Sequence, residues 1–183
     1  MYTCFDIANY FLKVQDIEVG ELISNMKLQK LVYYAQGYYL AINSTPLFYE
    51  KIYAWSYGPV CKDLWDLYKI YDKNPIPRPQ SFQIEAIFDK KTAHLLEKIQ
   101  NEYGIYSAWG LSNLTHKDSI WIEARDTGGV EITHESMEKY FLQKLIDKYP
   151  FFRNRACCKP DSAMNTQRVE GDFIYYKREN LYD

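Results

Sequence analysis

The chain contains 183 residues, of which 47% are hydrophobic and 25% are charged, and its formal net charge is −2. This length and balance are typical of a soluble globular domain with a substantial core. No cluster of Lys and Arg stands out beyond Arg153/Arg155 and Lys177/Arg178, so we expect no direct binding of DNA or RNA, which requires concentrated positive charge.

Aromatic residues are unusually frequent: they make up 17% of the chain, and 18 residues are tyrosines. A tyrosine can bury its ring while its hydroxyl stays hydrogen-bonded or hydrated, which suits half-exposed contact surfaces. An AT-rich genome would also enrich tyrosine codons. The composition therefore supports either a contact surface or compositional drift.

The N-terminal part of the chain is predicted to be helical. Thr3 followed by Asp6 resembles a capping box at the start of a first helix. A second helix is predicted over about residues 26–43, with Ser24 or Asn25 as its N-cap. Its apolar stripe follows a period of 3.6 residues and contains Leu28, Leu31, Val32, Ala35, Tyr39 and Ile42.

The second helix also has less ordinary positions. Lys27, Lys30, Tyr34 and Tyr38 lie off the apolar stripe and form its polar side. Gly37 interrupts the pattern at a cost of about 1 kcal/mol relative to Ala. Either close packing or a ligand would explain a glycine at this position.

A short aromatic strand is predicted over residues 52–57, after an extended partner at residues 47–49. Pro59 is then expected in the first turn of a third helix, where its missing N–H is harmless. The apolar stripe of this helix contains Val60, Leu64, Leu67, Tyr68 and Tyr71. Residues 74–79 form a proline-rich, extended loop.

Further helices are predicted over residues 89–103, 107–114 and 119–126, and from Thr133 onward. Helical periodicity ends after Pro150, and residues 172–179 alternate as a strand that could dock on the sheet edge or on a partner. We therefore predict a mainly α fold. A compact helical domain with a small antiparallel β-element covers residues 1–150, and a partly separate C-terminal extension covers residues 151–183.

Patterns typical of catalysis are weak. Cys61 could pair with His116 or His94 as a thiol–imidazole nucleophile, but no nucleophile motif surrounds it, and a packed structural thiol is the alternative. The cysteines contain no C-x-x-C, the histidines form no close ligand pair, and neither paired carboxylates nor a phosphate-binding loop is found. We expect no enzyme, no metal and no cofactor. The cysteines are Cys4, Cys61, Cys157 and Cys158.

The chain is expected to be cytoplasmic, with reduced thiols. The first residues lack the basic segment of a signal peptide. Residues 31–49 carry no charge, but Gln36, Gly37 and residues 43–46 interrupt the stretch too early for a bilayer span. We therefore expect no membrane association.

Several sequence blocks together resemble a known family. K-L-Q-K-L-V-Y-Y-A-Q-G-Y-Y-L begins at Lys27 and is followed by P-L-F-Y-E from Pro46, A-W-S-Y-G-P-V from Ala54 and L-S-N-L-T-H-K-D-S-I-W from Leu111. Their order and spacing are similar to those of the Panacea domain, which is found in SocA-like antitoxins and GepA-like phage-associated proteins. The resemblance extends from about residue 3 to residue 142.

This resemblance implies an antitoxin that neutralises a cognate toxin, encoded nearby, by direct protein–protein binding. In the SocA case the domain also delivers the toxin to a protease, so a cytosolic protease is a further expected partner. Two alternatives stay open: a phage-associated host-interaction protein without a toxin partner, and a Cys/His hydrolase.

The blocks also contain the residues that we expect to contact the partner. Gly58 permits close backbone approach, the predicted start of the third helix offers N–H groups to an acidic or carbonyl-bearing segment, and Tyr and Trp rings are frequent interface anchors. Because side chains alternate along a strand, some of these rings should be outside, while others would fill the core. The candidate residues are Lys27, Lys30, Tyr34, Trp55, Tyr57, Gly58, Pro59, Val60, His116 and Trp121.

Overall fold

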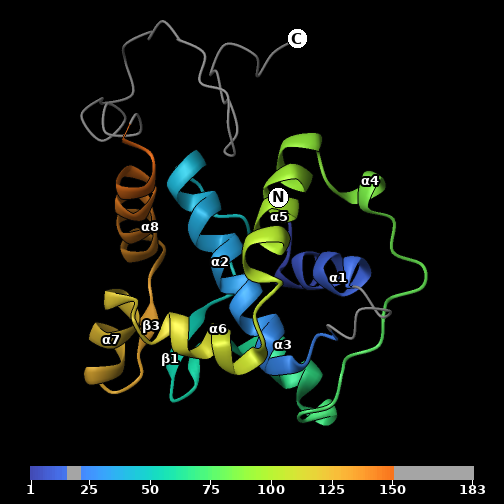
Figure 1. Cartoon of the computed structure of the whole chain (residues 1–183), viewed down its shortest axis with the longest axis horizontal. Coiled ribbons are helices and arrows are strands. Elements are labelled where there is room, and N and C mark those ends of the chain that lie inside the picture. The colour runs from blue at the N-terminus through green and yellow to red at the C-terminus, as the bar shows by residue number, and fades with distance from the viewer. Residues whose placement is uncertain (16–21, 151–183) are drawn as a thin grey trace, which may run out of the picture.

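A computed structural model describes residues 1–15 and 22–150. The domain is mostly helical and has a small antiparallel sheet at its lower edge, which confirms the predicted mainly α fold (Figure 1). The helices are α1 (Cys4–Val14), α2 (Asn25–Asn43), α3 (Lys62–Tyr68), the 3-10 helix η1 (Lys69–Tyr71), α4 (Ile84–Ile87), α5 (Lys90–Tyr103), α6 (Ala108–Thr115), α7 (Ser119–Asp126) and α8 (His134–Lys148); the strands are β1 (Ile52–Trp55), β2 (Gly58–Cys61) and β3 (Glu131–Ile132). The predicted extension over residues 151–183, with its strand at residues 172–179, lies outside the described residues.

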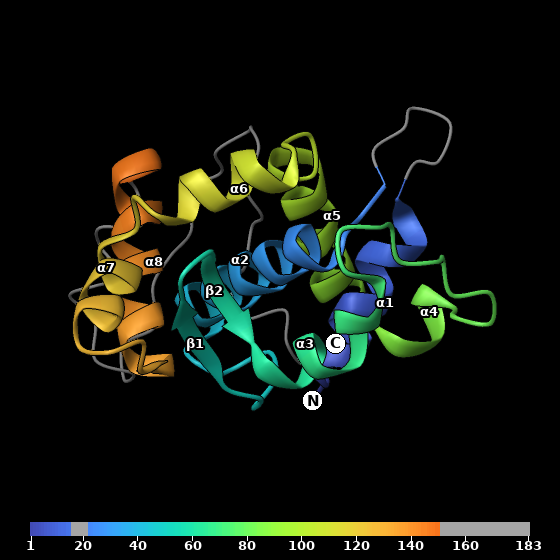
Figure 2. The same cartoon turned by 90° about the horizontal axis from the view of Figure 1, so that it is seen from below.

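Helix α2 lies at the centre of the domain, between α8 on one side and α1 and α5 on the other (Figure 1). Seen from below, α6 and the β1–β2 hairpin also flank it (Figure 2). Ser24 caps its start, as predicted, by accepting a hydrogen bond from the N–H of Lys27. Nearly all of its 19 residues are buried, so this helix has no broad solvent-facing side.

Gly37 marks the contact between α2 and α8. A Cβ atom at this position would collide with the ring of Phe141, which is itself fully buried. The missing side chain lets an aromatic ring pack directly on the α2 backbone. Close packing, rather than a ligand, therefore accounts for the glycine in the helix.

The sheet has the order β2-β1-β3, and both pairs are antiparallel. In β1, Ile52 and Ala54 are buried while Tyr53 and Trp55 are half-buried, as alternation along a strand requires. The predicted strand partner at residues 47–49 is wrong, because β1 pairs with β2 and β3 instead. The N–H groups of Leu47 and Phe48 donate to the Gln36 side chain.

The start of the third helix also differs from the prediction. Pro59 lies in β2, opposite Ala54, and α3 begins only at Lys62. The turn between β1 and β2 brings Gly58 to a φ of 103°, a conformation that only glycine adopts without strain. No helix within the described ranges is long and apolar enough to cross a membrane.

Candidate binding surface

The candidate residues on α2 are part of the interior. Lys27, Lys30 and Tyr34 are only 4%, 1% and 1% exposed. The Lys27 ammonium donates to the carbonyl of Gly104 at 2.5 Å, and Tyr34 stacks on Tyr103 with ring centroids 3.9 Å apart. This corrects the expectation of an outward polar side on α2: these side chains cannot touch a partner unless the domain rearranges.

The polar residues of α2 bond to the backbone of surrounding segments. The Lys30 ammonium donates to the carbonyl of Pro59 at 3.0 Å, and the Gln29 side chain accepts from the N–H of Cys61 at 2.9 Å. The Gln36 side chain donates to the carbonyl of Phe48 at 2.8 Å. Since a buried backbone group without a partner is costly, these side chains fix the strand and loop positions around the helix.

A buried carboxylate, that of Asp118, links side chains of α2 and α8, and the sequence analysis did not select it. Asp118, 2% exposed, accepts from the hydroxyls of Tyr33 at 3.1 Å and Tyr140 at 2.6 Å, and from the ammonium of Lys144 at 3.0 Å. Desolvation, followed by the charge of Asp118, raises the pKa of Tyr33. The position of Asp118 inside the L-T-H-K-D block was the signal that could have revealed it.

Three candidates in β2 are also buried, namely Gly58, Pro59 and Val60. A Cβ atom at Gly58 would lie 2.6 Å from Oγ1 of Thr115 and 2.7 Å from Cε of Lys30. The glycine therefore lets the hairpin turn sit on α6 and α2. Its close backbone approach serves the fold, and no partner is needed to explain it.

The remaining candidates do come together around the hairpin turn. Tyr57 is 61% exposed and Trp55 is half-buried. The rings of His116 and Trp121 stack 4.2 Å apart, and the Trp121 indole donates to the carbonyl of Trp55 at 3.1 Å. Burial, followed by the charge of Lys30, lowers the pKa of His116. Four of the ten candidates thus lie together around the turn, whereas the other six are buried.

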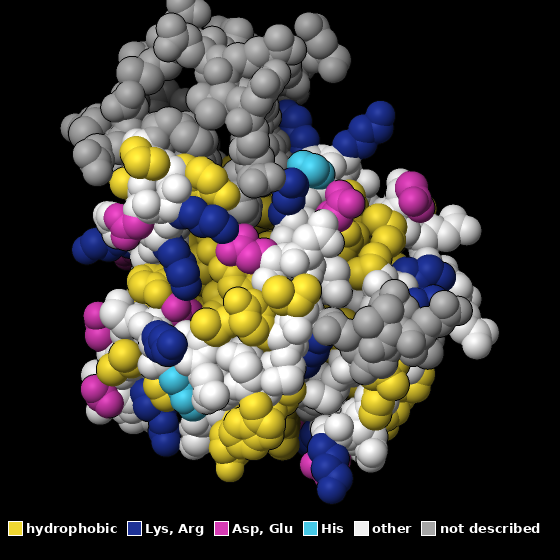
Figure 3. Space-filling view, in the orientation of Figure 1, with side chains coloured by type: hydrophobic (Ala, Val, Ile, Leu, Met, Phe, Trp, Pro, Cys, Tyr) yellow, Lys and Arg dark blue, Asp and Glu magenta, His cyan; other side chains and the backbone are white. Residues whose placement is uncertain are grey.

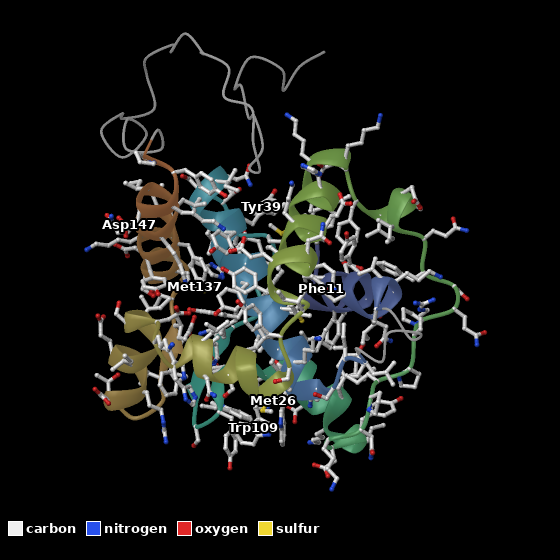
Figure 4. The ribbon with its side chains drawn as sticks, viewed as in Figure 1. Phe11, Met26, Tyr39, Trp109, Met137 and Asp147 are labelled. Atoms are coloured by element: carbon white, nitrogen blue, oxygen red, sulfur yellow. The ribbon has the colours of Figure 1, made fainter. Side chains whose placement is uncertain are left out.

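An exposed tryptophan that the sequence analysis did not select completes this cluster. Trp109 on α6 is 60% exposed, and its ring meets that of Tyr57 edge to face with centroids 5.7 Å apart. Trp109 projects from the lower edge of the domain (Figure 4), where hydrophobic side chains gather (Figure 3). We call this region the hairpin–α6 surface; it consists of Trp55, Tyr57, Trp109, His116 and Trp121.

Backbone and side-chain groups of the hairpin turn are held from both flanking helices. The Ser112 hydroxyl donates to the carbonyl of Tyr57 at 2.9 Å, and the Arg125 guanidinium donates to the hydroxyl of Ser56 at 3.1 Å. Together with the indole of Trp121, these bonds fix three successive residues of the turn. The exposed rings are therefore presented on a rigid backbone.

The thiol–imidazole pair is not assembled. Cys61 is 1% exposed, and its thiol lies within hydrogen-bonding reach of the Cys4 thiol, not of a histidine. The bond to Cys61 and burial raise the pKa of Cys4. In the part of the chain that the structure describes, no group of three or more His, Cys, Asp or Glu side chains could hold a metal ion.

Comparison with known proteins points to one family. The family described as "Antitoxin SocA-like, Panacea domain" matches residues 28–122, which is just over half of the chain. The match includes α2 from Leu28 onward, the hairpin, α6 and the whole L-T-H-K-D-S-I-W block. Neither curated protein sequences nor solved structures show a significant similarity to the chain.

Proposed function

The chain belongs to the SocA-like antitoxin family with its Panacea domain, and we propose that it neutralises a cognate toxin by binding it directly. The single observation that supports a binding role for this chain is the exposed ring pair on the hairpin–α6 surface. Tyr57 and Trp109 are 61% and 60% exposed yet contact each other. Paired, exposed Tyr and Trp rings are the side chains most often found as energetic anchors of protein interfaces.

Rigidity strengthens this interpretation. A side chain or loop that must be ordered on binding reduces affinity, whereas a preorganised one does not. The turn that carries Tyr57 is already fixed by bonds from Ser112 and Arg125. The rings can therefore contribute their burial to binding with little ordering cost.

Co-expression with the neighbouring gene tests this function. We expect that gene to arrest growth, and the native chain to restore it. The double variant Tyr57→Ala/Trp109→Ala should fold but lose neutralisation, because it removes both anchors. Tyr49→Ala is the matched control, since Tyr49 is also 61% exposed but contacts His134 on another part of the domain.

Other outcomes separate the alternatives. A neighbouring gene without toxicity would favour a host-interaction protein. Loss of neutralisation in a folded Cys61→Ser variant, with the ring variants intact, would favour the hydrolase. We further propose that the chain acts as a proteolytic adaptor. In that case a cytosolic protease would shorten the half-life of the toxin only when this chain is present. If the chain acts by binding alone, it would block the purified toxin without any protease.

A further inference from the structure

A groove of about 680 Å³ lies beside the hairpin–α6 surface. One wall carries the rings of Trp55 and Trp65, whose centroids are 5.2 Å apart, with the Lys69 ammonium 5.0 Å from the centroid of the Trp65 ring. Arg125 and the turn at residues 128–129 also line the groove, and the first part of α2 contributes further lining residues. The groove therefore combines flat apolar rings with cationic side chains.

The charge of the groove is opposite to that of the chain. Three cationic side chains line it, those of Lys30, Lys69 and Arg125, against the single carboxylate of Asp72, whereas the whole chain carries a formal net charge of −2. The ammonium nitrogen of Lys69 forms an ion pair with a carboxylate oxygen of Asp66, 2.9 Å away. Among the described residues, no carboxylate pairs with Lys30 or Arg125.

Lys30 is the least ordinary of these cations. It is 1% exposed, and the hydrogen bond that the structure shows for its ammonium goes to the carbonyl of Pro59. Burial of a cation without a carboxylate is costly, and here it lowers the pKa of Lys30 to about 7. An anion that enters the groove would supply the missing negative charge without any change in the fold.

We propose that this groove receives an acidic peptide segment of the protein partner, with a carboxylate held by Arg125 and Lys69 above the buried Lys30 and with apolar neighbours against Trp55 and Trp65. This inference rests on the proposed function, because the partner is the protein that the hairpin–α6 surface anchors. Arg binds carboxylates through two parallel N–H bonds, and complementary charge sets the choice and orientation of partners.

A nucleic acid would fit the groove less well. Its backbone needs a run of positive charges along several phosphates, whereas the groove offers only three cationic side chains, with the carboxylate of Asp72 among them. This short cationic site suits one or two acidic side chains better than an extended polyanion. The observations therefore favour a peptide.

Nuclear magnetic resonance of the full chain tests the inference with a defined probe. The probe is the capped hexapeptide Leu-Glu-Asp-Leu-Glu-Leu, and its control is Leu-Gln-Asn-Leu-Gln-Leu. We expect the acidic peptide to shift the indole signals of Trp55 and Trp65, and Arg125→Gln to weaken its binding about tenfold, the effect of one charge-assisted bond. Lys139→Gln, an exposed change on α8, should leave binding unchanged.

Three results would overturn the proposal: no indole shifts with the acidic peptide, equal shifts with both peptides, or tighter binding of single-stranded oligothymidylate than of the acidic peptide. Its failure is distinct from that of the proposed function. If Arg125→Gln neutralises the toxin normally while Tyr57→Ala/Trp109→Ala does not, the groove inference is wrong and the antitoxin role stands. If the double variant neutralises normally, the anchor surface is wrong, and the peptide shifts still decide the groove.

Discussion

Helix α2 and the hairpin–α6 surface are in contact but are built in opposite ways. In α2 the polar side chains are buried and bond to the backbone of neighbouring segments, as Lys30 and Gln36 do. On the hairpin–α6 surface the backbone carbonyl of Tyr57 accepts a hydrogen bond from Ser112, and the aromatic side chains of Tyr57 and Trp109 are exposed. The residues that carry the family resemblance are thus largely the scaffold, and under the proposed function we expect the choice of partner to depend on the exposed residues beside them.

This difference predicts that variants of the interior change stability, and variants of the surface change binding only. The largest loss of stability is expected for Asp118→Ala. It leaves two tyrosine hydroxyls and the Lys144 ammonium without their shared acceptor. The Lys144 ammonium is 34% exposed and can be hydrated, but the Tyr33 hydroxyl is fully buried. Bonds to a charged group contribute about 1.5–3 kcal/mol each, so urea unfolding should record a loss of about 3 kcal/mol or more. Asp126→Ala, an exposed change on α7, is the control and should be nearly neutral; equal losses in both would contradict the interior role of Asp118.

Gly37→Ala should be the next most harmful change. Its new methyl group collides with the Phe141 ring, and overpacking of a core costs about 1–3 kcal/mol. Gly110→Ala in α6 is a matched control: its new methyl group would lie 3.3 Å from the Ser107 hydroxyl, a far milder contact, and the gain in helix propensity of up to about 1 kcal/mol should offset it, so the change should be nearly neutral. Because leucine has no ring, adding Phe141→Leu should recover part of the stability that Gly37→Ala loses. Additive losses in that double variant would contradict the packing explanation.

Lys30 should impose a pH dependence on stability. Its pKa is about 7 in the folded chain and 10.5 when exposed, so between pH 7 and pH 9 the unfolded chain holds one more proton. Stability therefore rises with pH in this window, by about 2 kcal/mol relative to Lys30→Met, which lacks the titrating group. Below pH 7 both states hold the proton and the difference becomes constant. Parallel urea-unfolding profiles of the two proteins from pH 7 to pH 9 would contradict this expectation, because they would mean that burial does not lower the pKa of Lys30.

The features that the sequence predicted correctly depend on local interactions, and those that it missed depend on tertiary contacts. Periodicity and caps predicted most of the helices and the mainly α fold, because Thr3, Ser24 and Thr133 act through local hydrogen bonds. The short helix α4 was not predicted. Pairing of β1 with β3 joins residues far apart in sequence, and nothing in the local pattern at residues 47–61 could reveal it.

The candidate site was predicted only in part for a similar reason. Lys27 and Lys30 lie off the apolar stripe, a position that normally indicates a solvent-exposed side chain. Both are nevertheless buried, because their ammonium groups donate to the backbone carbonyls of Gly104 and Pro59. Such partners depend on tertiary structure. Trp109 was overlooked because its exposure follows from the placement of α6 and not from its own neighbours in sequence.

The smallest effect on stability is expected at the exposed rings, and it is the sharpest test of the comparison. Tyr57→Ala and Trp109→Ala each remove a mostly exposed side chain, so each should change the free energy of unfolding by no more than about 0.5 kcal/mol, apart from the ring contact that they share. That edge-to-face contact adds about 0.5–1.5 kcal/mol, and a double-mutant cycle in urea isolates it. Toxin binding should weaken far more, by at least about 2 kcal/mol for each anchor, as titration calorimetry with the purified toxin would record. Losses of unfolding free energy as large as the losses of binding would place these rings in the scaffold, and the contrast between α2 and the hairpin–α6 surface would then no longer hold.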